Sequence, residues 1–381
     1  MKLVPEIGFA QLAKKDEELC GDRVEINRTP ENAVIVLSDG LGSGVKANIL
    51  ATLTTKIAAK MIRHNVPVND VVETIVSTLP TCRVRDLAYS TFTIVKIADN
   101  GQAHIVEYDA PPVLKISENM IVPITTSYRK VQGKIIGEAS IGLKEGDILV
   151  LVSDGVTQAG LGGILPLGLG VDGLIFHLKE NLKVKNSAQK IANEIIELCH
   201  AYYAQEAGDD TTAVVLKLRR SREAIVFTGP PIDETLDSKV VKEFINKKGI
   251  KIVCGGTTAN IVARELNRPV LVNFDYVDSD IPPIAKIPGI DLVTEGILTL
   301  TKGLEYLENN STSTGNLLDG SSLLVKKLLE CDKITFMVGT KINPAHQNPG
   351  LPLPLGLRKS IVERWQKNLE DRGKIVEIIW F

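Results

Sequence analysis

The chain has 381 residues, more than one hydrophobic core usually organises, so we expect two domains. Its 44 basic and 46 acidic residues leave a formal net charge of −2, and no dense run of Lys or Arg occurs. This balance argues against a nucleic-acid-binding surface and against a basic membrane-binding patch.

Cysteine usage and hydropathy indicate a reducing compartment. The five cysteines are odd in number, widely spaced and never paired as C-x-x-C, so neither disulfides nor a zinc cluster is indicated. The start of the chain lacks the apolar core of a signal peptide, and the apolar stretch 161–176 contains Pro166 and is too short to span a bilayer. We expect a soluble, cytoplasmic protein without a membrane partner.

The first elements of the chain predict a strand pair followed by helices. After an N-terminal helix or strand, residues 24–27 and 33–38 are typical of an antiparallel pair around a turn. Apolar residues recurring at helical spacing predict a helix from about 45 to 64, and a shorter helix is expected at 68–79.

Strands in hairpins dominate the next hundred residues, before a helix and a closing strand. The expected strands lie at 90–97, 103–109, 112–116 and 148–153, the helix at 187–204 and the closing strand at 212–218. Because these strands do not alternate with helices, two packed sheets flanked by helices are the simplest architecture. The expected fold class is α+β, an α-β-β-α sandwich over residues 1–220.

The charged segment 219–223 marks a boundary, beyond which strand and helix signals alternate. That alternation predicts a smaller α/β domain over residues 221–381 with a partly parallel sheet. Its expected elements are strands at 224–227, 251–253 and 332–338 and helices at 238–247 and 258–266. The Pro- and Gly-rich stretch 343–354 is expected to be a surface excursion or a partner contact.

Acidic residues stand at strand ends in three places. Asp39 and Asp154 each follow an apolar run and precede a glycine, and the pair Asp209-Asp210 precedes a third apolar run. Carboxylates at the rim of a rigid sheet suit the hard cations Mg²⁺ or Mn²⁺, not Zn²⁺. The alternative is that each Asp-Gly pair closes a strand as a turn or caps the next helix.

Five short segments in this order and spacing resemble metal-dependent serine/threonine phosphatases, and more closely the bacterial branch typified by the sporulation stage II protein E phosphatase. The resemblance covers about residues 15–218. Its segments are Gly21-Asp22, the run from Ser38 to Gly44, the run from Tyr89 to Phe92, the run from Ile148 to Gly155, and the run from Gly208 to Thr212.

The resemblance implies an α-β-β-α sandwich whose cleft holds two Mn²⁺ or Mg²⁺ ions. It implies that Asp39 bridges both ions, that Gly40 offers its backbone carbonyl, and that Asp154 and Asp209 bind from another strand. Asp22 matches the family's early aspartate near the metals. The resemblance also implies direct attack on the phosphoryl group by a hydroxide that bridges the metals, with Asp39, Asp154 and Asp209 as the catalytic set.

Several positions qualify the resemblance. Asp210 is expected to stand behind the ligands and support them. Leu41 occupies the place where the eukaryotic branch has a histidine, and the phosphate-binding arginine of that branch has no counterpart, so Arg23 and Lys46 are the nearest cationic candidates. Segment 161–173, rich in glycine, predicts either a lid over the cleft or an irregular loop.

In the second domain, four residues open a helix directly after a strand and predict either an anion site or a plain capped turn. These residues are Gly255, Gly256, Thr257 and Thr258. A small ligand or a docked partner is therefore expected for this domain.

The sequence as a whole predicts a phosphatase acting on phosphoserine or phosphothreonine of a regulatory phosphoprotein, by resemblance one of the anti-anti-sigma kind, in a chain that can form a homodimer. The alternatives are a non-catalytic ligand- or partner-binding module on the same fold, and a small-molecule phosphatase.

Overall fold

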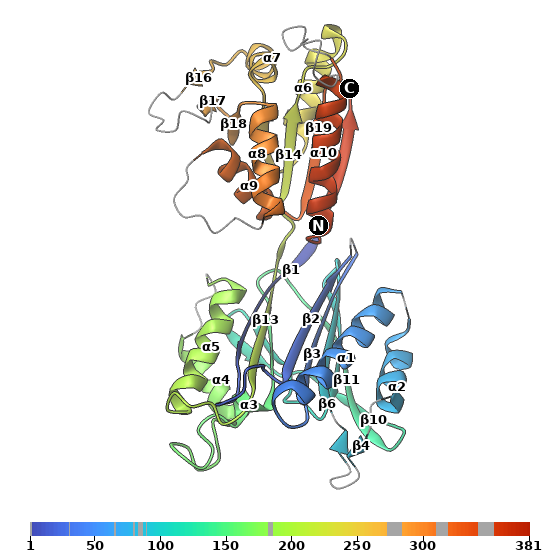
Figure 1. The fold of residues 1–381 in the computed structure, drawn as a ribbon, viewed down its shortest axis with the longest axis vertical. Helices are drawn as coiled ribbons and strands as arrows, with labels where there is room; N and C mark the ends of the chain where they lie inside the picture. The colour runs from blue at the N-terminus through green and yellow to red at the C-terminus, as the bar shows by residue number, and fades with distance from the viewer. Residues whose placement is uncertain are drawn as a thin grey trace. The chain divides into compact units, whose positions relative to one another are not determined.

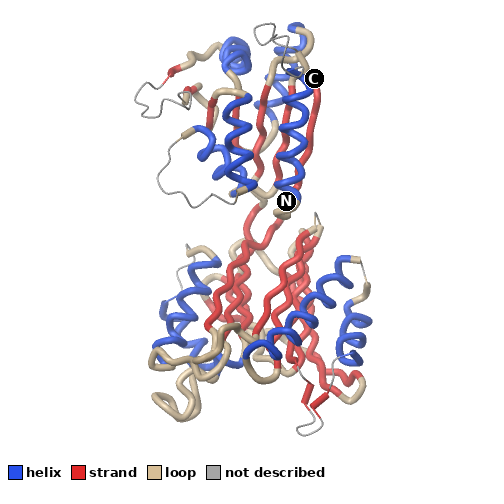
Figure 2. Tube along the Cα trace, viewed as in Figure 1, coloured by secondary structure: helices blue, strands red, loops and turns tan. Residues whose placement is uncertain are grey.

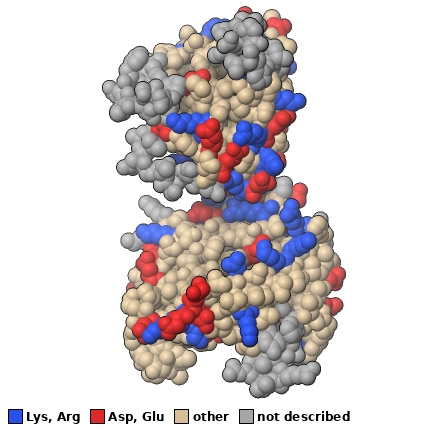
Figure 3. All heavy atoms as spheres, in the orientation of Figure 1, with Lys and Arg blue, Asp and Glu red and all other residues tan. Residues whose placement is uncertain are grey.

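A computed structural model describes residues 2–29, 31–64, 66–78, 81–82, 87–88, 90–181, 186–272, 284–309, 319–341 and 354–381. The chain divides into two compact units, Met1–Arg220 and Ser221–Phe381, called unit 1 and unit 2 below. Each has its own sheets and its own hydrophobic core. Basic and acidic side chains both occur on each unit, on the face drawn in Figure 3.

Unit 1 contains a six-stranded antiparallel sheet with the order β10-β11-β7-β6-β3-β2. Its strands are β2 (Asp22–Arg28), β3 (Asn32–Gly40), β6 (Ser90–Ala98), β7 (Gln102–Tyr108), β10 (Ser127–Val131) and β11 (Lys134–Gly142). β2 and β3 form the predicted hairpin, and β3 pairs on its other side with β6. A separate short pair joins β4 (Thr81–Cys82) to β5 (Leu87–Ala88).

The second sheet of unit 1 has the order β1-β13-β12-β8-β9. Its strands are β1 (Leu3–Leu12), β8 (Leu114–Ser117), β9 (Met120–Val122), β12 (Ile148–Val152) and β13 (Thr211–Arg220). The N-terminal segment is thus a strand, and it pairs along its whole length with β13.

Side-chain alternation packs the two sheets face to face. Ile35 and Leu37 of β3 and Leu149 and Leu151 of β12 point into one shared cluster between the sheets. The intervening residues of the same strands point outward, because successive strand residues face opposite sides. This inner face is the main core of unit 1.

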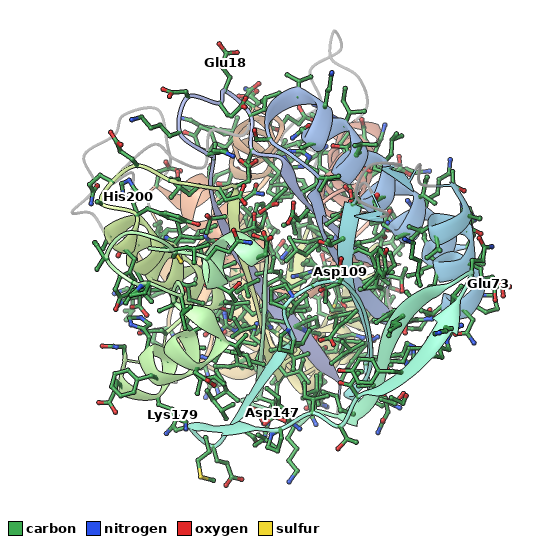
Figure 4. The ribbon with its side chains drawn as sticks, turned by 90° about the horizontal axis from the view of Figure 1, so that it is seen from below. Glu18, Glu73, Asp109, Asp147, Lys179 and His200 are labelled. Carbon is green, nitrogen blue, oxygen red and sulfur yellow. The ribbon has the colours of Figure 1, made fainter. Side chains whose placement is uncertain are left out.

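Helices cover both outer faces, which completes an α-β-β-α sandwich (Figures 1 and 2). α1 (Gly44–Arg63) and α2 (Val68–Thr78) pack on the outer face of the β3 sheet. α4 (Gly170–Asn181) and α5 (Ala188–Tyr202) pack on the other sheet, and one turn, α3 (Asp154–Thr157), follows β12. Figure 4 shows the ribbon from below, with α1 and α2 in blue on one side and α4 and α5 in green on the other.

The predicted α+β sandwich is confirmed, with one local correction. Residues 161–173 were expected to form one lid or loop, but their last part belongs to α4, which begins at Gly170. The glycines that obscured this helix lie ahead of it or at its first turn. The preceding residues 160–168 are turns that include an isolated bridge between Leu161 and Leu165.

Unit 2 is a doubly wound sheet with the order β16-β17-β18-β15-β14-β19-β20. Its strands are β14 (Glu223–Thr228), β15 (Ile250–Cys254), β16 (Leu271–Val272), β17 (Ala285–Lys286), β18 (Leu292–Thr294), β19 (Lys333–Val338) and β20 (Ile375–Trp380). Five neighbouring strands of this sheet are parallel, namely β18, β15, β14, β19 and β20. β16 and β17 add an antiparallel edge.

Helices lie on both faces of this sheet. α6 (Asp237–Asn246) and α7 (Gly256–Leu266) contribute to one core cluster, and α8 (Ile297–Glu308), α9 (Gly320–Leu329) and α10 (Pro354–Glu370) contribute to the other. The predicted α/β character is confirmed, whereas α8, α9, α10 and β20 were not predicted. The stretch 343–354 falls, except for its last residue, outside the described residues. No helix of the described chain is long and apolar enough to cross a membrane.

Candidate active site

The alternation of β2 and β3 places two aspartates on the inner face of their sheet. Asp39 follows Leu37 by two positions on β3, so it continues the row of residues that faces the other sheet. Asp22 opposes Asp39 in the register of the β2–β3 pair. Both carboxyl groups therefore project into the space between the sheets, at the end where the apolar filling stops.

Two further acidic positions reach the same end from the second sheet. Asp154 follows β12, and Asp209 and Asp210 directly precede β13, its antiparallel neighbour. A glycine brings these chain segments together: a Cβ on Gly155 would lie only 2.1 Å from the Asp210 carbonyl oxygen. Only glycine permits this approach, so the Asp-Gly sequence at 154–155 is required by packing.

Burial and neighbouring carboxyl groups raise the pKa of Asp39. Burial raises its pKa to about 10, with further contributions from the charges of Asp22, Asp154 and Asp209 and from a hydrogen bond with the Asp154 side chain. Like charges gathered where water is excluded disfavour ionisation. Asp39 is therefore protonated at neutral pH unless a cation compensates the group.

Asp22 is the most deeply buried member of the group. It is 0% exposed, and its Oδ2 accepts a hydrogen bond of 2.6 Å from the hydroxyl of Thr212 on β13. Burial raises its pKa to about 7, the hydrogen bonds from Thr212 and Ser153 lower it in part, and the charges of Asp210 and Asp154 raise it again. Its second oxygen, Oδ1, is buried without a hydrogen-bond partner among the described residues.

Asp210 repeats this pattern beside it. The residue is 3% exposed, and its Oδ1 accepts a hydrogen bond of 3.0 Å from the backbone N–H of Lys14. Its Oδ2 is buried and has no partner in the part of the chain that the structure describes. Asp209, half-exposed, has a pKa raised by burial and by the charge of Asp154, and the charge of Lys14 partly opposes this. Buried carboxylate oxygens without donors are costly.

The oxygen donors of this aspartate group suit a hard divalent cation. Two orphaned oxygens, a carboxyl pair joined by one hydrogen bond and raised pKa values all describe acid groups short of positive charge. Within the described part of the chain, however, no three acidic, histidine or cysteine side chains are arranged as a ready-made metal cluster. The aspartates are thus neighbours whose oxygens do not converge on one point.

Gly40 and its surroundings support the position of Asp39. A Cβ on Gly40 would lie 2.1 Å from the Ala47 carbonyl oxygen, so glycine allows α1 to pack against the end of β3. Next to Asp39, the hydroxyl oxygens of Ser38 and Ser90 lie 2.5 Å apart. The Ser90 hydroxyl donates a hydrogen bond to the backbone carbonyl of Asp39. This buried polar network fixes the backbone that carries Asp39.

Three contacts were not predicted from the sequence, although Thr212 itself lies in the segment from Gly208 to Thr212 named above. Gln158 donates a hydrogen bond of 2.7 Å from Nε2 to Asp154, one helical turn away, and Thr212 and Lys14 act on Asp22, Asp209 and Asp210 as described above. The i, i+4 spacing of Asp154 and Gln158 was the available signal. The predicted cationic candidates Arg23 and Lys46 are both exposed.

A pocket of about 320 Å³ opens beside Asp209. Leu161 and Ile164 of the turn segment, Tyr203 and Gln158 are among its lining residues. The tyrosine hydroxyl donates a 2.7 Å hydrogen bond to the Gly155 carbonyl, so the pocket wall is tied to the loop that carries Asp154.

The four residues singled out in unit 2 lie at the end of β15. Gly255 precedes α7, and Gly256, Thr257 and Thr258 form its first turn, with Thr258 only 1% exposed. Gly255 has a φ of +125°, which a non-glycine residue rarely adopts. They belong to unit 2, whereas the aspartate group belongs to unit 1.

Comparison with known proteins is consistent with this architecture. The family model described as Stage II sporulation protein E matches residues 29–219, half of the chain. The Stage II sporulation protein E of Bacillus subtilis (strain 168) is 25% identical over 224 residues, covering 55% of this chain and 25% of the relative. The chain thus matches only a quarter of that relative's length.

Solved structures also resemble part of this chain. The PP2C phosphatase domain of Bacillus subtilis SpoIIE, with a fragment of its regulatory domain, matches with a TM-score of 0.50 and 21% identity over 57% of this chain and 64% of that one. The RsbU and RsbW domains of a Mycobacterium tuberculosis protein match with a TM-score of 0.47 and 17% identity over 64% of this chain and 70% of that one.

Unit 1 therefore has the fold of the PP2C phosphatase domains, as the resemblance in the sequence implied. The chain belongs to the SpoIIE family.

Proposed function

We propose that unit 1 is a Mn²⁺- or Mg²⁺-dependent serine/threonine phosphatase that acts on a bacterial regulatory phosphoprotein. The observation that carries the proposal is the gathering of aspartates from both sheets at one end of the sandwich, in a chain of the SpoIIE family. A binding scaffold has no need of mutually repelling acids in a buried place, because each one lowers its stability.

In this proposal the aspartates hold the cations. Asp39 contributes from β3, Asp22 from β2, and Asp154 and Asp209 from the second sheet, with the backbone carbonyl of Gly40 as an additional oxygen. Two bound divalent cations supply a water activated at neutral pH and offset the charge that grows on the phosphoryl oxygens.

The chain's own groups then orient the ligands. Thr212 holds one oxygen of Asp22, and Gln158 holds one oxygen of Asp154, so each carboxylate presents its other oxygen to the site. Asp210 stands behind them, anchored by the backbone of Lys14. The Lys14 side chain, whose charge acts on Asp209, is the candidate among the described residues to attract a phosphate group.

The family and the pocket support a proposal for the substrate class. The SpoIIE relative is described as a cell fate determinant, and we propose that this chain also dephosphorylates a signalling protein of the anti-anti-sigma kind in the cytoplasm, alone or as a homodimer. The pocket beside Asp209 accommodates a residue that flanks the phosphoserine or phosphothreonine.

Turnover of p-nitrophenyl phosphate and of a panel of phosphoserine and phosphothreonine peptides, with Mn²⁺ and with EDTA, tests the proposal. We expect Mn²⁺-dependent release of phosphate that Asp39→Asn abolishes. Asp172→Asn is the matched control. It makes the same chemical change at Asp172, which is exposed on α4 and is not one of the proposed site residues. Metal-independent turnover, or none with any substrate, would contradict the proposal; hydrolysis of small phosphate esters alone would favour a small-molecule phosphatase.

A further inference from the structure

The parallel sheet of unit 2 reverses its strand order between β14 and β19. From β14 the chain adds β15 and then β18 on one side, and it returns to add β19 and β20 on the other. In open sheets of this kind, ligands bind outside the carboxyl ends of the strands at the point of reversal. That point lies where Thr228 of β14 pairs with Val338 of β19.

Three neighbouring strands end there in register, and each is followed by a glycine. Thr228 pairs with both Cys254 and Val338, and the next residues are Gly229, Gly255 and Gly339. Gly229 has a φ of +78°, and a Cβ on Gly339 would lie 2.0 Å from the Pro230 carbonyl oxygen. The loops after β14 and β19 are therefore packed backbone against backbone.

One arginine reaches this junction from the second turn of α10. Arg358 is only 8% exposed, and its Nη1 donates a 2.8 Å hydrogen bond to the Gly339 carbonyl. A Cβ on Gly229 would lie 2.5 Å from the same nitrogen. The guanidinium group thus lies between the two loops that flank the reversal point.

This buried charge lacks an anionic partner among the residues that the structure describes. Arg358 forms no ion pair with them, and its Nε is buried without a hydrogen-bond partner. Burial lowers its pKa, and no charge on the described residues opposes that effect. Arginine stays protonated even so, and a buried charge without a counter-charge is unfavourable.

A structural role alone leaves this charge unexplained. Arg358 does tie the Gly339 carbonyl and, at 3.5 Å, the Lys341 carbonyl into one corner. Carbonyl dipoles use one nitrogen of the guanidinium and leave Nε unpaired. A neutral donor could bridge two carbonyls, so the positive charge itself calls for a negative group nearby.

We propose that unit 2 binds a small ligand through an oxyanion group, a phosphate or a carboxylate, at the carboxyl edge between β14 and β19, with Arg358 as its charged contact. The planar guanidinium fits either group through two parallel hydrogen bonds. The first turn of α7 follows β15 at the same edge and can contribute backbone N–H groups to the remainder of the ligand. This site is independent of the aspartates of unit 1.

The tryptophans provide a local measurement. The chain has two, both in unit 2: Trp365 lies on α10 with Arg358, and Trp380 pairs with Val338 at the end of β20. Trp365 is 0% exposed and donates a hydrogen bond to the Leu300 carbonyl. Tryptophan emission of the full chain therefore reports on unit 2, and EDTA in the buffer keeps cation-dependent phosphate binding in unit 1 out of the titration.

Inorganic phosphate and, separately, acetate are titrated to about 10 mM at constant ionic strength, which detects dissociation constants near 1 mM. We expect a saturable emission change with at least one of them. Arg358→Gln should weaken the apparent affinity at least about tenfold, and Arg358→Lys by less, since lysine keeps the charge but not the paired donors. Saturation by phosphate or by acetate alone assigns the oxyanion.

Two controls isolate the site. Lys359→Gln removes a neighbouring exposed charge on the same helix and should leave the titration unchanged. Asp39→Asn should also leave it unchanged, which separates this site from the phosphatase site. No saturable response to either anion, or an equal response in Arg358→Gln, would overturn the proposal. Should Arg358→Gln not fold, Arg358→Lys decides: an affinity equal to that of the natural chain for both anions would also overturn it.

Discussion

Asp22 and Asp39 stand directly opposite each other in the β2–β3 ladder, with both side chains on the inner face of the sheet. Two like charges in opposed positions destabilise a strand pair. Here they are also buried close to the charge of Asp154. The burial of these acidic groups is unfavourable for stability. A cation bound between the carboxylates would offset that cost.

Asp39→Asn should separate activity from stability. Loss of a residue that merely supports a metal ligand costs about 10–100-fold in metal affinity or activity, so loss of the ligand itself should lower kcat/KM by at least about a hundredfold. Without metal, the variant should melt about 2–4 °C higher, because asparagine is neutral in both states and folding no longer requires a buried carboxyl group to take up a proton. This shift corresponds to about 1 kcal/mol for a unit of this size. Steady-state kinetics and thermal melts in EDTA measure both; a lower melting temperature in EDTA would contradict this account.

The pH dependence of stability should have an unusual sign in EDTA. The pKa of Asp39 is raised to about 10 and that of Asp22 to about 7, against about 3.9 in the unfolded chain. Between these values the folded state binds more protons than the unfolded state, so the free energy of unfolding falls as pH rises from about 4 through 7. Mn²⁺ competes with those protons, and its stabilising effect should therefore grow with pH.

Thermal melts from pH 5 to 8, with EDTA and with Mn²⁺, measure this directly. The melting temperature in EDTA should decrease over this range, and the increment from Mn²⁺ should increase. In Asp39→Asn the pH slope should be reduced. A melting temperature in EDTA that rises steadily with pH would show that other groups control the stability of unit 1.

Thr212→Val should weaken metal binding more than catalysis. The Thr212 hydroxyl holds Asp22 Oδ2 at 2.6 Å, and its removal leaves that carboxylate free to turn. We expect an apparent metal affinity about 10–100-fold lower, with kcat largely restored at saturating Mn²⁺. Thr212→Ser keeps the hydroxyl and serves as the matched control. Equal metal affinities in the natural chain and in Thr212→Val would show that this hydrogen bond does not orient Asp22.

Gly155→Ala should destabilise unit 1 and lower activity together. The added Cβ would lie 2.1 Å from the Asp210 carbonyl oxygen, and backbone there cannot move without displacing the start of β13. Overpacking of this kind costs about 1–3 kcal/mol. Gly142→Ala is the control, because its Cβ would meet nothing nearer than 3.7 Å and should change stability by less than about 0.5 kcal/mol. Denaturant unfolding compares the two.

Lys14→Gln should raise KM for phosphorylated substrates by about tenfold while kcat changes little. The Lys14 charge acts on Asp209, where the proposed site receives the dianionic phosphate group of the substrate. Lys15→Gln provides the comparison, since Lys15 is exposed and pairs with Glu206 at 2.9 Å in a surface ion pair. Equal effects of the two substitutions on KM would assign Lys14 no special role.

The sequence predicted the parts of the fold that rest on local patterns. The β2–β3 hairpin and α1 follow from alternation and helical spacing near their own residues. α4 was missed because its first turn lies among the glycines of the preceding segment, and β20 was missed because nothing local indicates that its apolar run ends a parallel sheet.

The site divides in the same way. Asp39 and Asp154 are marked by the strand runs before them, and the sequence identifies them without knowledge of the tertiary structure. Thr212, Lys14 and Arg358 are not marked: a threonine inside a strand, a lysine after one and an arginine on a helix have ordinary local surroundings. Their contacts depend on which strands become neighbours, and that becomes visible only in the folded chain.

Anomalous diffraction from crystals grown with Mn²⁺ tests the central claim most directly. The account predicts anomalous peaks between the two sheets of unit 1, with a carboxylate oxygen of Asp39 about 2.0–2.4 Å from Mn²⁺ and at least one oxygen of Asp22, Asp154 or Asp209 completing the site. Crystals that bind Mn²⁺ elsewhere, with no peak beside Asp39 at a concentration that supports full activity, would contradict it.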